Sequence, residues 1–218
     1  MIQKYIIKID KDFLQSIHTG HYHTPTVYFH ANIGVRWLFW ERFNQISKLI
    51  IKNNRAKRKI CLDFGGGAGV FLPTLSKMFD KVILVDLEPS QALIIKEKFK
   101  LDNCEILKEN IFDFDMKDID VIIAADVIER FDNTLTILKK LQILMSKDSF
   151  LYTSLPAENG FYAFLRKVFK EEKPIDHYYG AYEIEDTFLK NGMLKQKEST
   201  IPLPKPFDLF KISEWKLA

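Results

Sequence analysis

Short apolar segments alternate with longer amphipathic segments through the middle of this 218-residue chain. The short segments are rich in Val, Ile and Leu, as buried strands are, and the longer ones have room for crossover helices. Such alternation is typical of βαβ units with right-handed connections, and it predicts an α/β fold built on a doubly wound, mostly parallel sheet. The expected strands are 60–64, 81–86, 104–107, 120–125 and 149–154, and the expected helices between them are 69–79, 89–100 and 133–145.

Further helices and strands are expected on both sides of this region. Residues 33–50 place apolar side chains at three- and four-residue spacing, which indicates an amphipathic helix. Residues 160–174 and 182–192 have helical character, and 193–203 and 206–215 can form two last strands. The prolines between these two strands make a stiff turn and keep that segment out of a central position in the sheet.

The composition excludes several classes of protein. With 47% apolar residues, 28% charged residues and a net charge of +3, the chain is neither disordered nor fibrous. A pI of 8.6 gives no support to a dedicated nucleic-acid-binding domain. The basic run at 52–59 is better explained as a solvated linker than as a patch for an anionic partner. Two cysteines fit a reducing compartment, and neither a signal peptide nor a membrane-spanning run is evident, so we expect a soluble cytoplasmic protein.

The first expected strand leads into a loop of four glycines within the stretch CLDFGGGAG. Glycine permits positive φ and lets a ligand approach the backbone where a Cβ atom would collide. A phosphate-binding P-loop is excluded because no Lys and Ser or Thr follow Gly69, and the dinucleotide fingerprint is excluded because Val70 stands where its last glycine belongs. The pattern that remains is D-x-G-x-G-x-G, formed by Asp63, Gly65, Gly67 and Gly69.

On these residues the chain resembles the class I S-adenosylmethionine (SAM)-dependent methyltransferases, in particular the broad small-molecule group that includes the type 11 and type 12 families. The resemblance covers residues 61 to about 192 and includes VDLEPS, ENIFDF and DVIIAADVIERFDN as counterparts of later family motifs. It implies a Rossmann-like sheet of seven strands, mostly parallel with an antiparallel last strand and with helices on both faces. It also implies SAM as the cofactor and S-adenosylhomocysteine (SAH) as the product.

The resemblance assigns cofactor contacts to particular residues. Asp86 ends the second strand, where the family places the acid that accepts both ribose hydroxyls, and a carboxylate offers paired acceptors to such a diol. Leu87 is expected to pack on the adenine face and Ile111 to flank the ring. Asn110 stands where the family usually has Asp, and its amide oxygen can accept the same adenine hydrogen bond. The full set of expected contacts is Asp63, Gly65, Gly67, Gly69, Asp86, Leu87, Asn110, Ile111, Ala125 and Asp126.

The fourth motif departs from the family at Arg130, where some members carry His, so we assign no catalytic role there. For Asp126 and Glu129, solvated positions at the start of a helix remain an alternative to ligand contact. All five histidines lie outside the expected sheet core, and His30, His177 and Tyr178 are the candidates for a catalytic group. We expect no metal site, because the spacing of His18, His21 and His23 matches no common zinc motif.

The aromatic residues gather in two segments, 22–43 and 161–182, with seven rings in each. The family covers its active site with the segment before the first strand and the insertion after the fifth, so both aromatic segments are expected to form a lid and an acceptor pocket. Ordinary packing of helix 33–50 is the alternative, and we favour it for Trp37, Trp40 and Phe43. The resulting division is a helical, aromatic lid segment at 1–59 and a SAM-binding domain at 60–218, with a lid insertion at about 157–182.

The expected function is methyl transfer by in-line displacement to a small, partly apolar or aromatic metabolite. An RNA or protein methyltransferase and a non-catalytic interaction protein with a SAM-binding fold are the alternatives. The near-neutral charge disfavours a nucleic-acid partner. Peripheral membrane contact through residues 33–50 stays open, and we expect a monomer or a homodimer.

Overall fold

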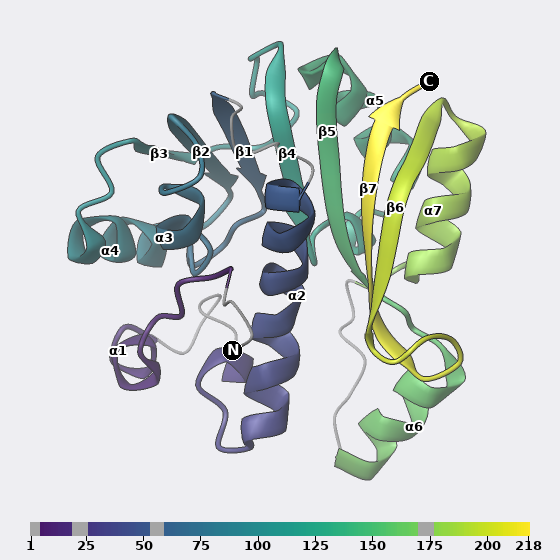
Figure 1. The fold of residues 1–218 in the computed structure, drawn as a ribbon, viewed down its shortest axis with the longest axis horizontal. Helices are drawn as coiled ribbons and strands as arrows, with labels where there is room; N and C mark the ends of the chain where they lie inside the picture. Colours follow the sequence, from purple (N-terminus) through teal and green to yellow (C-terminus); the bar gives the residue numbers. More distant parts are fainter. Residues whose placement is uncertain (1–4, 19–25, 53–58, 170–176) are drawn as a thin grey trace. The chain divides into compact units, whose positions relative to one another are not determined.

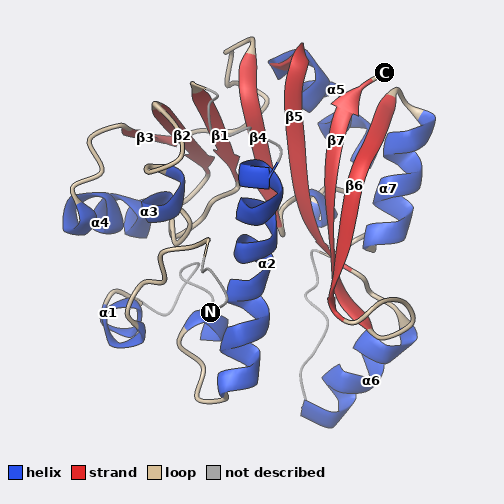
Figure 2. Ribbon diagram, in the orientation of Figure 1, coloured by secondary structure: helices blue, strands red, loops and turns tan. Residues whose placement is uncertain are grey.

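The computed structural model describes residues 5–18, 26–52, 59–169 and 177–218 (Figure 1). The chain divides into two compact units, Met1–Asp115 and Met116–Ala218. Seven strands form one sheet in the order β3-β2-β1-β4-β5-β7-β6, with helices around it (Figure 2). His21, His23 and most of the basic run at 52–59 lie outside the described residues. The predicted division at residue 59 stays a prediction.

The first unit contains the three strands at one side of the sheet. They are β1 (Ile60–Phe64), β2 (Lys81–Asp86) and β3 (Cys104–Lys108). β1 pairs with β2 and β2 pairs with β3, both in parallel. The helices of this unit are α1 (Lys11–Ser16), η1 (Thr26–Tyr28), α2 (Ile33–Lys52), α3 (Leu72–Leu75) and α4 (Ser90–Phe99). The predicted strands 60–64 and 81–86 are therefore confirmed.

The helix predicted over 69–79 is wrong in extent, because only Leu72–Leu75 is α-helical. Gly69 has a φ of 74°, which a right-handed helix does not allow. The backbone around it closes short turns instead, with Leu72 N donating to Gly69 O at 3.0 Å and Thr74 N donating to Phe71 O at 3.0 Å. The glycine loop thus extends further into the crossover than the periodicity indicates.

Helix α2 packs its apolar face inside the first unit, mainly through four buried side chains. Trp40, Phe43, Ile46 and Ile50 are buried, and the rings of Phe43 and Phe71 stack with centroids 4.4 Å apart. The packing interpretation is therefore confirmed for Trp40 and Phe43. It is wrong for Trp37, which is about half exposed (47%) because it lies on the side of the helix away from these contacts.

The second unit contains β4 (Ile119–Ala125), β5 (Met145–Pro156), β6 (Met193–Pro202) and β7 (Asp208–Leu217). β4 and β5 are parallel, and β7 is antiparallel to both β5 and β6. The prediction of one antiparallel last strand is confirmed. The helices of this unit are η3 (Ile128–Arg130), α5 (Thr134–Leu144), α6 (Gly160–Phe169) and α7 (Ala181–Lys190). Among the described residues, no helix is both long and apolar enough to cross a membrane.

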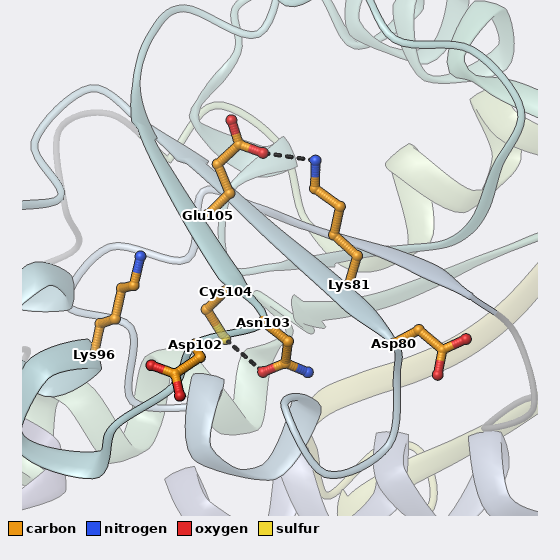
Figure 3. Close-up of a pocket in the computed structure, with 7 residues that line it drawn as sticks. All are labelled: Asp80, Lys81, Lys96, Asp102, Asn103, Cys104 and Glu105. Carbon is orange, nitrogen blue, oxygen red and sulfur yellow. Dashed lines mark hydrogen bonds and ion pairs between the residues drawn. The ribbon is translucent and has the colours of Figure 1, made fainter.

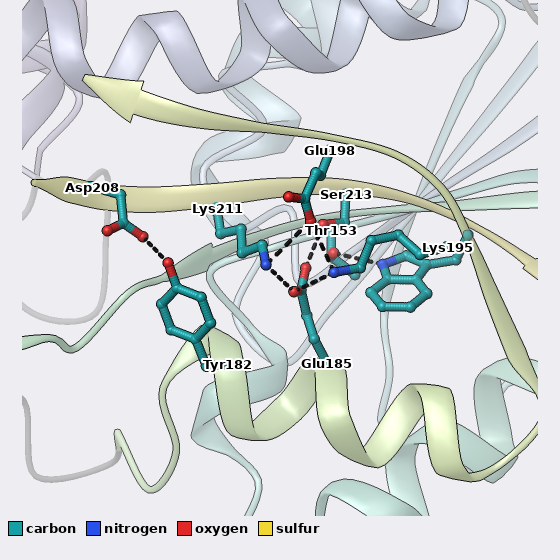
Figure 4. Close-up of polar contacts among 9 residues, drawn as sticks. Thr153, Tyr182, Glu185, Lys195, Glu198, Asp208, Lys211 and Ser213 are labelled. Carbon is teal, nitrogen blue, oxygen red and sulfur yellow. Dashed lines mark hydrogen bonds and ion pairs between the residues drawn. The ribbon is translucent and has the colours of Figure 1, made fainter. Parts of the chain in front are cut away.

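A buried ion cluster fastens α7 to the last two strands (Figure 4). The Glu185 carboxylate lies 2.6 Å from Lys211 Nζ and 2.7 Å from Lys195 Nζ, and it accepts a hydrogen bond from the Ser213 hydroxyl. Burial by itself would lower the pKa of Lys211, but the hydrogen bond and charge of Glu185, followed by those of Glu198, raise it above its usual value. Lys211 therefore stays charged inside this part of the fold.

Removing the charge of Glu185 should destabilise the protein strongly, because two lysines would then lose their shared buried partner. We expect Glu185→Gln to lower the free energy of unfolding by about 3 kcal/mol or more, measured by urea denaturation. Glu198→Gln is the matched control, since the Glu198 side chain is half exposed, and should cost at most about 1 kcal/mol. Equal losses in the two variants would contradict this account of the cluster.

Candidate active site

The loop after β1 has a conformation that depends on glycine. Gly65, Gly67 and Gly69 have φ angles of 68°, 52° and 74°, a region that L-amino acids with a Cβ atom adopt only at a cost. Gly65 N donates to Val85 O at 2.9 Å, which ties the start of the loop to β2. The loop therefore turns sharply at the carboxyl end of β1, where parallel α/β sheets bind ligands.

Two glycines of the loop are needed for close packing and one faces open space. A Cβ atom on Gly66 would lie 2.6 Å from Asp63 Oδ2 and 2.7 Å from Leu84 Cδ1, and one on Gly69 would lie 2.8 Å from Ala92 Cβ. A Cβ atom on Gly67 would meet no atom within 4 Å. A ligand could thus approach the loop at Gly67. The importance of Gly66 was missed because the D-x-G-x-G-x-G pattern skips that position.

Asp86 holds the loop from the end of the neighbouring strand. Its Oδ2 accepts a hydrogen bond from Gly67 N at 2.9 Å, and its Oδ1 accepts one from Glu88 N at 2.8 Å. Each carboxylate oxygen has a second lone pair that can accept another donor. The carboxylate is thereby oriented by two backbone amides and can still bind a ligand with paired hydroxyls.

Asp63 carries a carboxyl group that is almost completely buried (3% exposed) beneath the loop. Within the described part of the chain, its Oδ2 has no hydrogen-bond partner. Burial raises the pKa of Asp63 to about 7, and the negative charge of Asp86 adds to this effect. The loop therefore covers a carboxyl group that a nearby cation would help to ionise.

The remaining predicted contacts in the first unit follow β2 and β3. Leu87 is largely exposed directly after Asp86, and Glu109 N donates to Asp86 O at 3.1 Å, which joins the ends of the two strands. Asn110 is exposed, and its amide oxygen accepts from Phe112 N at 3.1 Å. Ile111 is buried, so its side chain belongs to the core of this unit. Eight of the ten predicted cofactor residues lie at these three strand ends.

The other two predicted cofactor residues lie in the second unit, where Ala125 ends β4 and Asp126 follows it. Asp126 has a φ of 56°, and its N–H donates to Ser154 O at 2.9 Å. Glu129 follows in η3 and is fully buried. The interpretation of Glu129 as a solvated residue is therefore wrong, because η3 turns its side chain into the unit.

Glu129 lies beside His177, one of the three catalytic candidates. The imidazole is nearly buried, with Nδ1 3.3 Å from Glu158 Oε1 and Nε2 4.0 Å from Glu129 Oε1. Tyr178 is about half exposed (54%), and its N–H donates to Glu129 O at 2.9 Å. The structure thus joins two candidates to the loop after β4. Their acidic neighbours were missed because the three segments are distant in the sequence.

His30, the third candidate, belongs to the first unit and helps to shape the turn before α2. Its Nδ1 accepts a hydrogen bond from Asn32 N at 3.0 Å, and its carbonyl oxygen accepts one from the Arg36 guanidinium. These contacts explain a structural role for His30. They leave its predicted catalytic role untested.

A buried polar pair near Asp63 was not expected from the sequence. Arg42 is 1% exposed, its Nη2 donates to the Tyr28 hydroxyl at 3.1 Å, and its guanidinium lies 4.5 Å from the centre of the Phe39 ring. Burial raises the pKa of Tyr28; the charge and hydrogen bond of Arg42 oppose this, and the Asp63 carboxylate adds to it. Helix α2 thus brings a buried positive charge beside the Tyr28 hydroxyl.

A pocket of about 410 Å³ lies elsewhere in the first unit (Figure 3). It is lined by the beginnings of β2 and β3, including Lys81 and Glu105, whose side chains form an ion pair at 2.7 Å. These are the amino ends of the strands, opposite the glycine loop. The pocket is therefore distinct from the candidate site.

Within the described residues, no three His, Cys, Asp or Glu side chains form a group that could hold a metal ion.

A family model described as a methyltransferase domain matches residues 39–206, which is most of the chain. The chain belongs to this methyltransferase family.

Similar solved structures share the fold of this chain. The N-methyltransferase NodS from Bradyrhizobium japonicum, solved with SAH, has a TM-score of 0.68 at 14% identity over 95% of this chain and 97% of its own. Magnesium protoporphyrin IX methyltransferase from Synechocystis with SAH has a TM-score of 0.67 at 14% identity over 87% and 89%. A SAM-dependent methyltransferase from Aquifex aeolicus has a TM-score of 0.64 at 19% identity over 96% and 100%.

Curated relatives match over a shorter stretch. The ribosomal RNA small subunit methyltransferase A of Mycoplasma capricolum is 29% identical over 79 residues, and that of Mycoplasma mycoides is 28% identical over 79 residues. Each match covers 36% of this chain and only 30% of the relative. This likeness covers too little of either protein to carry over the activity of the whole relative.

The raised pKa of Asp63 gives a test of the site in the absence of any ligand. Above about pH 4 the unfolded chain releases the Asp63 proton, whereas the folded chain keeps it until its pKa of about 7. This residue therefore lowers the free energy of unfolding as pH rises through that window, by up to about 1.4 kcal/mol per pH unit. Asp63→Asn should remove the decrease and stabilise the protein at pH 7 in chemical denaturation.

Asp80→Asn is the control, because Asp80 is exposed in the same unit and should leave the pH dependence unchanged. If Asp63→Asn were as pH-sensitive as the original protein, the carboxyl group could not be held protonated by burial.

Proposed function

We propose that this chain is a SAM-dependent methyltransferase that acts on a small, partly apolar or aromatic metabolite. The observation that carries the proposal is the arrangement at the end of β1, where Asp86 orients an open Gly67 above the buried Asp63. A cofactor with a diol and a positive charge fits these groups, because the diol needs paired acceptors and the charge favours an ionised Asp63. SAM has both features.

Each residue of the proposed cofactor site has a role that its position supports. Asp86 accepts the ribose hydroxyls, and the exposed Leu87 next to it packs on the adenine face. Asn110 accepts a hydrogen bond from the adenine amino group. Ile111, which is buried beside it, flanks the adenine ring. Gly65, Gly67 and Gly69 let the cofactor approach the backbone. Ala125 and Asp126 at the end of β4 stay predicted contacts.

SAM, when bound, supplies an electrophilic methyl group that an acceptor takes by in-line displacement. The protein has to align the acceptor and exclude water, and alignment alone can supply effective molarities of about 10⁵ M or more. Asp63 and Asp86 contribute negative charge near a cationic cofactor. A general base is needed only for an acceptor that must lose a proton, and His30, His177 and Tyr178 remain the candidates.

A small acceptor is supported by the charge of the chain and by the similar structures. The net charge of +3 gives no extended positive field for a polyanion. The similar solved structures include a magnesium protoporphyrin IX methyltransferase and a methyltransferase with bound 1,6-didemethyltoxoflavin. Methylation of RNA is the second candidate function, since the curated relatives are ribosomal RNA methyltransferases. A cytoplasmic location and a monomeric or homodimeric state stay predictions.

Replacing Asp86 tests the cofactor assignment. Asp86→Ala should weaken SAM binding at least about tenfold, because each lost hydrogen bond to a charged group is worth about 1.5–3 kcal/mol, and titration calorimetry measures this. Glu105→Ala is the control, because this exposed carboxylate lies on β3 beside Lys81, away from the loop. Since Asp86 also holds two amides, the melting temperature of each variant is compared first. Unchanged SAM affinity in a folded Asp86→Ala protein would show that the ribose contact is wrong.

The acceptor and the catalytic candidates are tested together. Incubation with methyl-labelled SAM and a host extract, separated into RNA, protein and small molecules, should label the small-molecule fraction; label in RNA alone would favour the second function.

With the labelled acceptor identified, His30→Gln, His177→Gln and Tyr178→Phe are compared in turnover and SAM affinity. Replacing the residue that accepts the proton should lower kcat by about 10²-fold or more, while SAM binding is retained. Full turnover in all three variants would exclude each of them as the base.

A further inference from the structure

Three large apolar side chains stand exposed at one end of the second unit. Phe164 on α6 is 59% exposed, and Leu203 and Phe207, in the connection between β6 and β7, are 56% and 50% exposed. In Figure 1 this connection lies against α6, and the Phe161 and Phe207 rings meet edge to face with centroids 5.3 Å apart. Phe164 follows Phe161 by one helical turn, so it continues the same side of α6. We call the surface formed by Phe164, Leu203 and Phe207 the α6 tip.

Hydrogen bonds and ring contacts at the start of α6 hold the α6 tip against the second unit. The Asn159 side chain caps α6 by accepting from Tyr162 N at 2.9 Å, and it donates to the Asp208 carbonyl oxygen and carboxylate at 2.8 and 2.9 Å. The Tyr162 ring packs edge to face on Phe210. One asparagine therefore fixes the start of the helix to the start of β7.

Lysines accompany the exposed apolar groups. Lys167 is exposed on α6, and Lys205 is exposed between Leu203 and Phe207, with its ammonium 4.3 Å from the centre of the Tyr182 ring. Among the acidic groups nearby, Asp208 is buried and accepts hydrogen bonds from Tyr182 and Asn159, whereas Glu158 and Glu183 line the pocket beside Lys205. The exposed apolar side chains are thus flanked by two lysines, of which Lys205 shares its pocket with carboxylates and Lys167 lies on α6.

We propose that the α6 tip binds the surface of an anionic phospholipid bilayer. An aromatic, amphipathic helix with lysines beside its apolar face enters the boundary between headgroups and acyl chains, while the lysines pair with anionic headgroups. The charge beside the apolar groups favours this partner over a second copy of the chain, whose own tip would bring the same positive charge. Helix α2, the earlier candidate for membrane contact, buries Trp40, Phe43, Ile46 and Ile50 of its apolar face, although Ile33 and Trp37 stay exposed.

Binding of a bilayer by the α6 tip does not depend on the proposed methyl transfer. The α6 helix nevertheless follows β5 closely in the chain. β5 ends at Pro156 and α6 begins at Gly160. Binding through the α6 tip would therefore bring the carboxyl end of β5 close to the lipid surface, where an apolar acceptor could partition.

Vesicle co-sedimentation of the full chain tests the proposal. Vesicles of phosphatidylcholine mixed with phosphatidylserine should bind the protein, and pure phosphatidylcholine should bind it at least about fivefold more weakly, since each lysine near an anionic surface contributes about that factor. Phe164→Ser combined with Phe207→Ser should abolish sedimentation. Lys167→Glu combined with Lys205→Glu should remove the preference for phosphatidylserine.

Ile143→Ser combined with Leu194→Ser is the matched control, because these side chains are as exposed (59% and 50%) but lie on α5 and β6; this variant should bind like the original protein. No sedimentation of the original protein, or equal loss in the control, would overturn the proposal. A dimer seen by light scattering that the Phe164 and Phe207 substitutions dissociate, without vesicle binding, would assign the tip to a second copy instead. SAM calorimetry on the same samples keeps this outcome apart from that of the proposed function.

Discussion

The carboxyl group of Asp63 lies beneath a turn of glycines, and this burial constrains the unit that surrounds it. Gly66 passes so close to the carboxylate that no side chain fits there, and the Asp86 carboxylate holds the next glycine from the neighbouring strand. Two acidic groups are thereby kept near each other, which costs stability at neutral pH. A cationic ligand at this loop would reduce that cost. The two acidic groups therefore favour the binding of a cation, although they lower the stability of the ligand-free protein.

The aromatic segments have two different uses in the structure. Tyr28, Trp40 and Phe43 pack against one another inside the first unit, where Tyr28 and Phe43 also contact the buried Arg42. Phe164 of the second segment is instead exposed on the α6 tip of the second unit, together with Phe207 from the connection between β6 and β7. The same abundance of rings therefore contributes to a core in one place and to an exposed surface in the other.

Local patterns predicted most strands, because continuous runs of branched apolar residues such as those of β1 and β2 have few alternatives to a buried parallel strand. The D-x-G-x-G-x-G loop and Asp86 were also predictable, since their spacing along the chain is fixed. The short α3 was not, because the turn at Gly69 overrides helical periodicity. The acidic neighbours of His177 could not be predicted either, since Glu129 and Glu158 approach it only through the tertiary fold.

Titration calorimetry of the full chain with SAM tests the central claim most directly. We expect saturable binding at one site with a dissociation constant between about 1 μM and 1 mM, the range in which enzymes usually bind their substrates, and comparable binding of SAH. No binding of either compound at concentrations up to about 1 mM would contradict the account, because the loop, Asp63 and Asp86 would then serve only the fold.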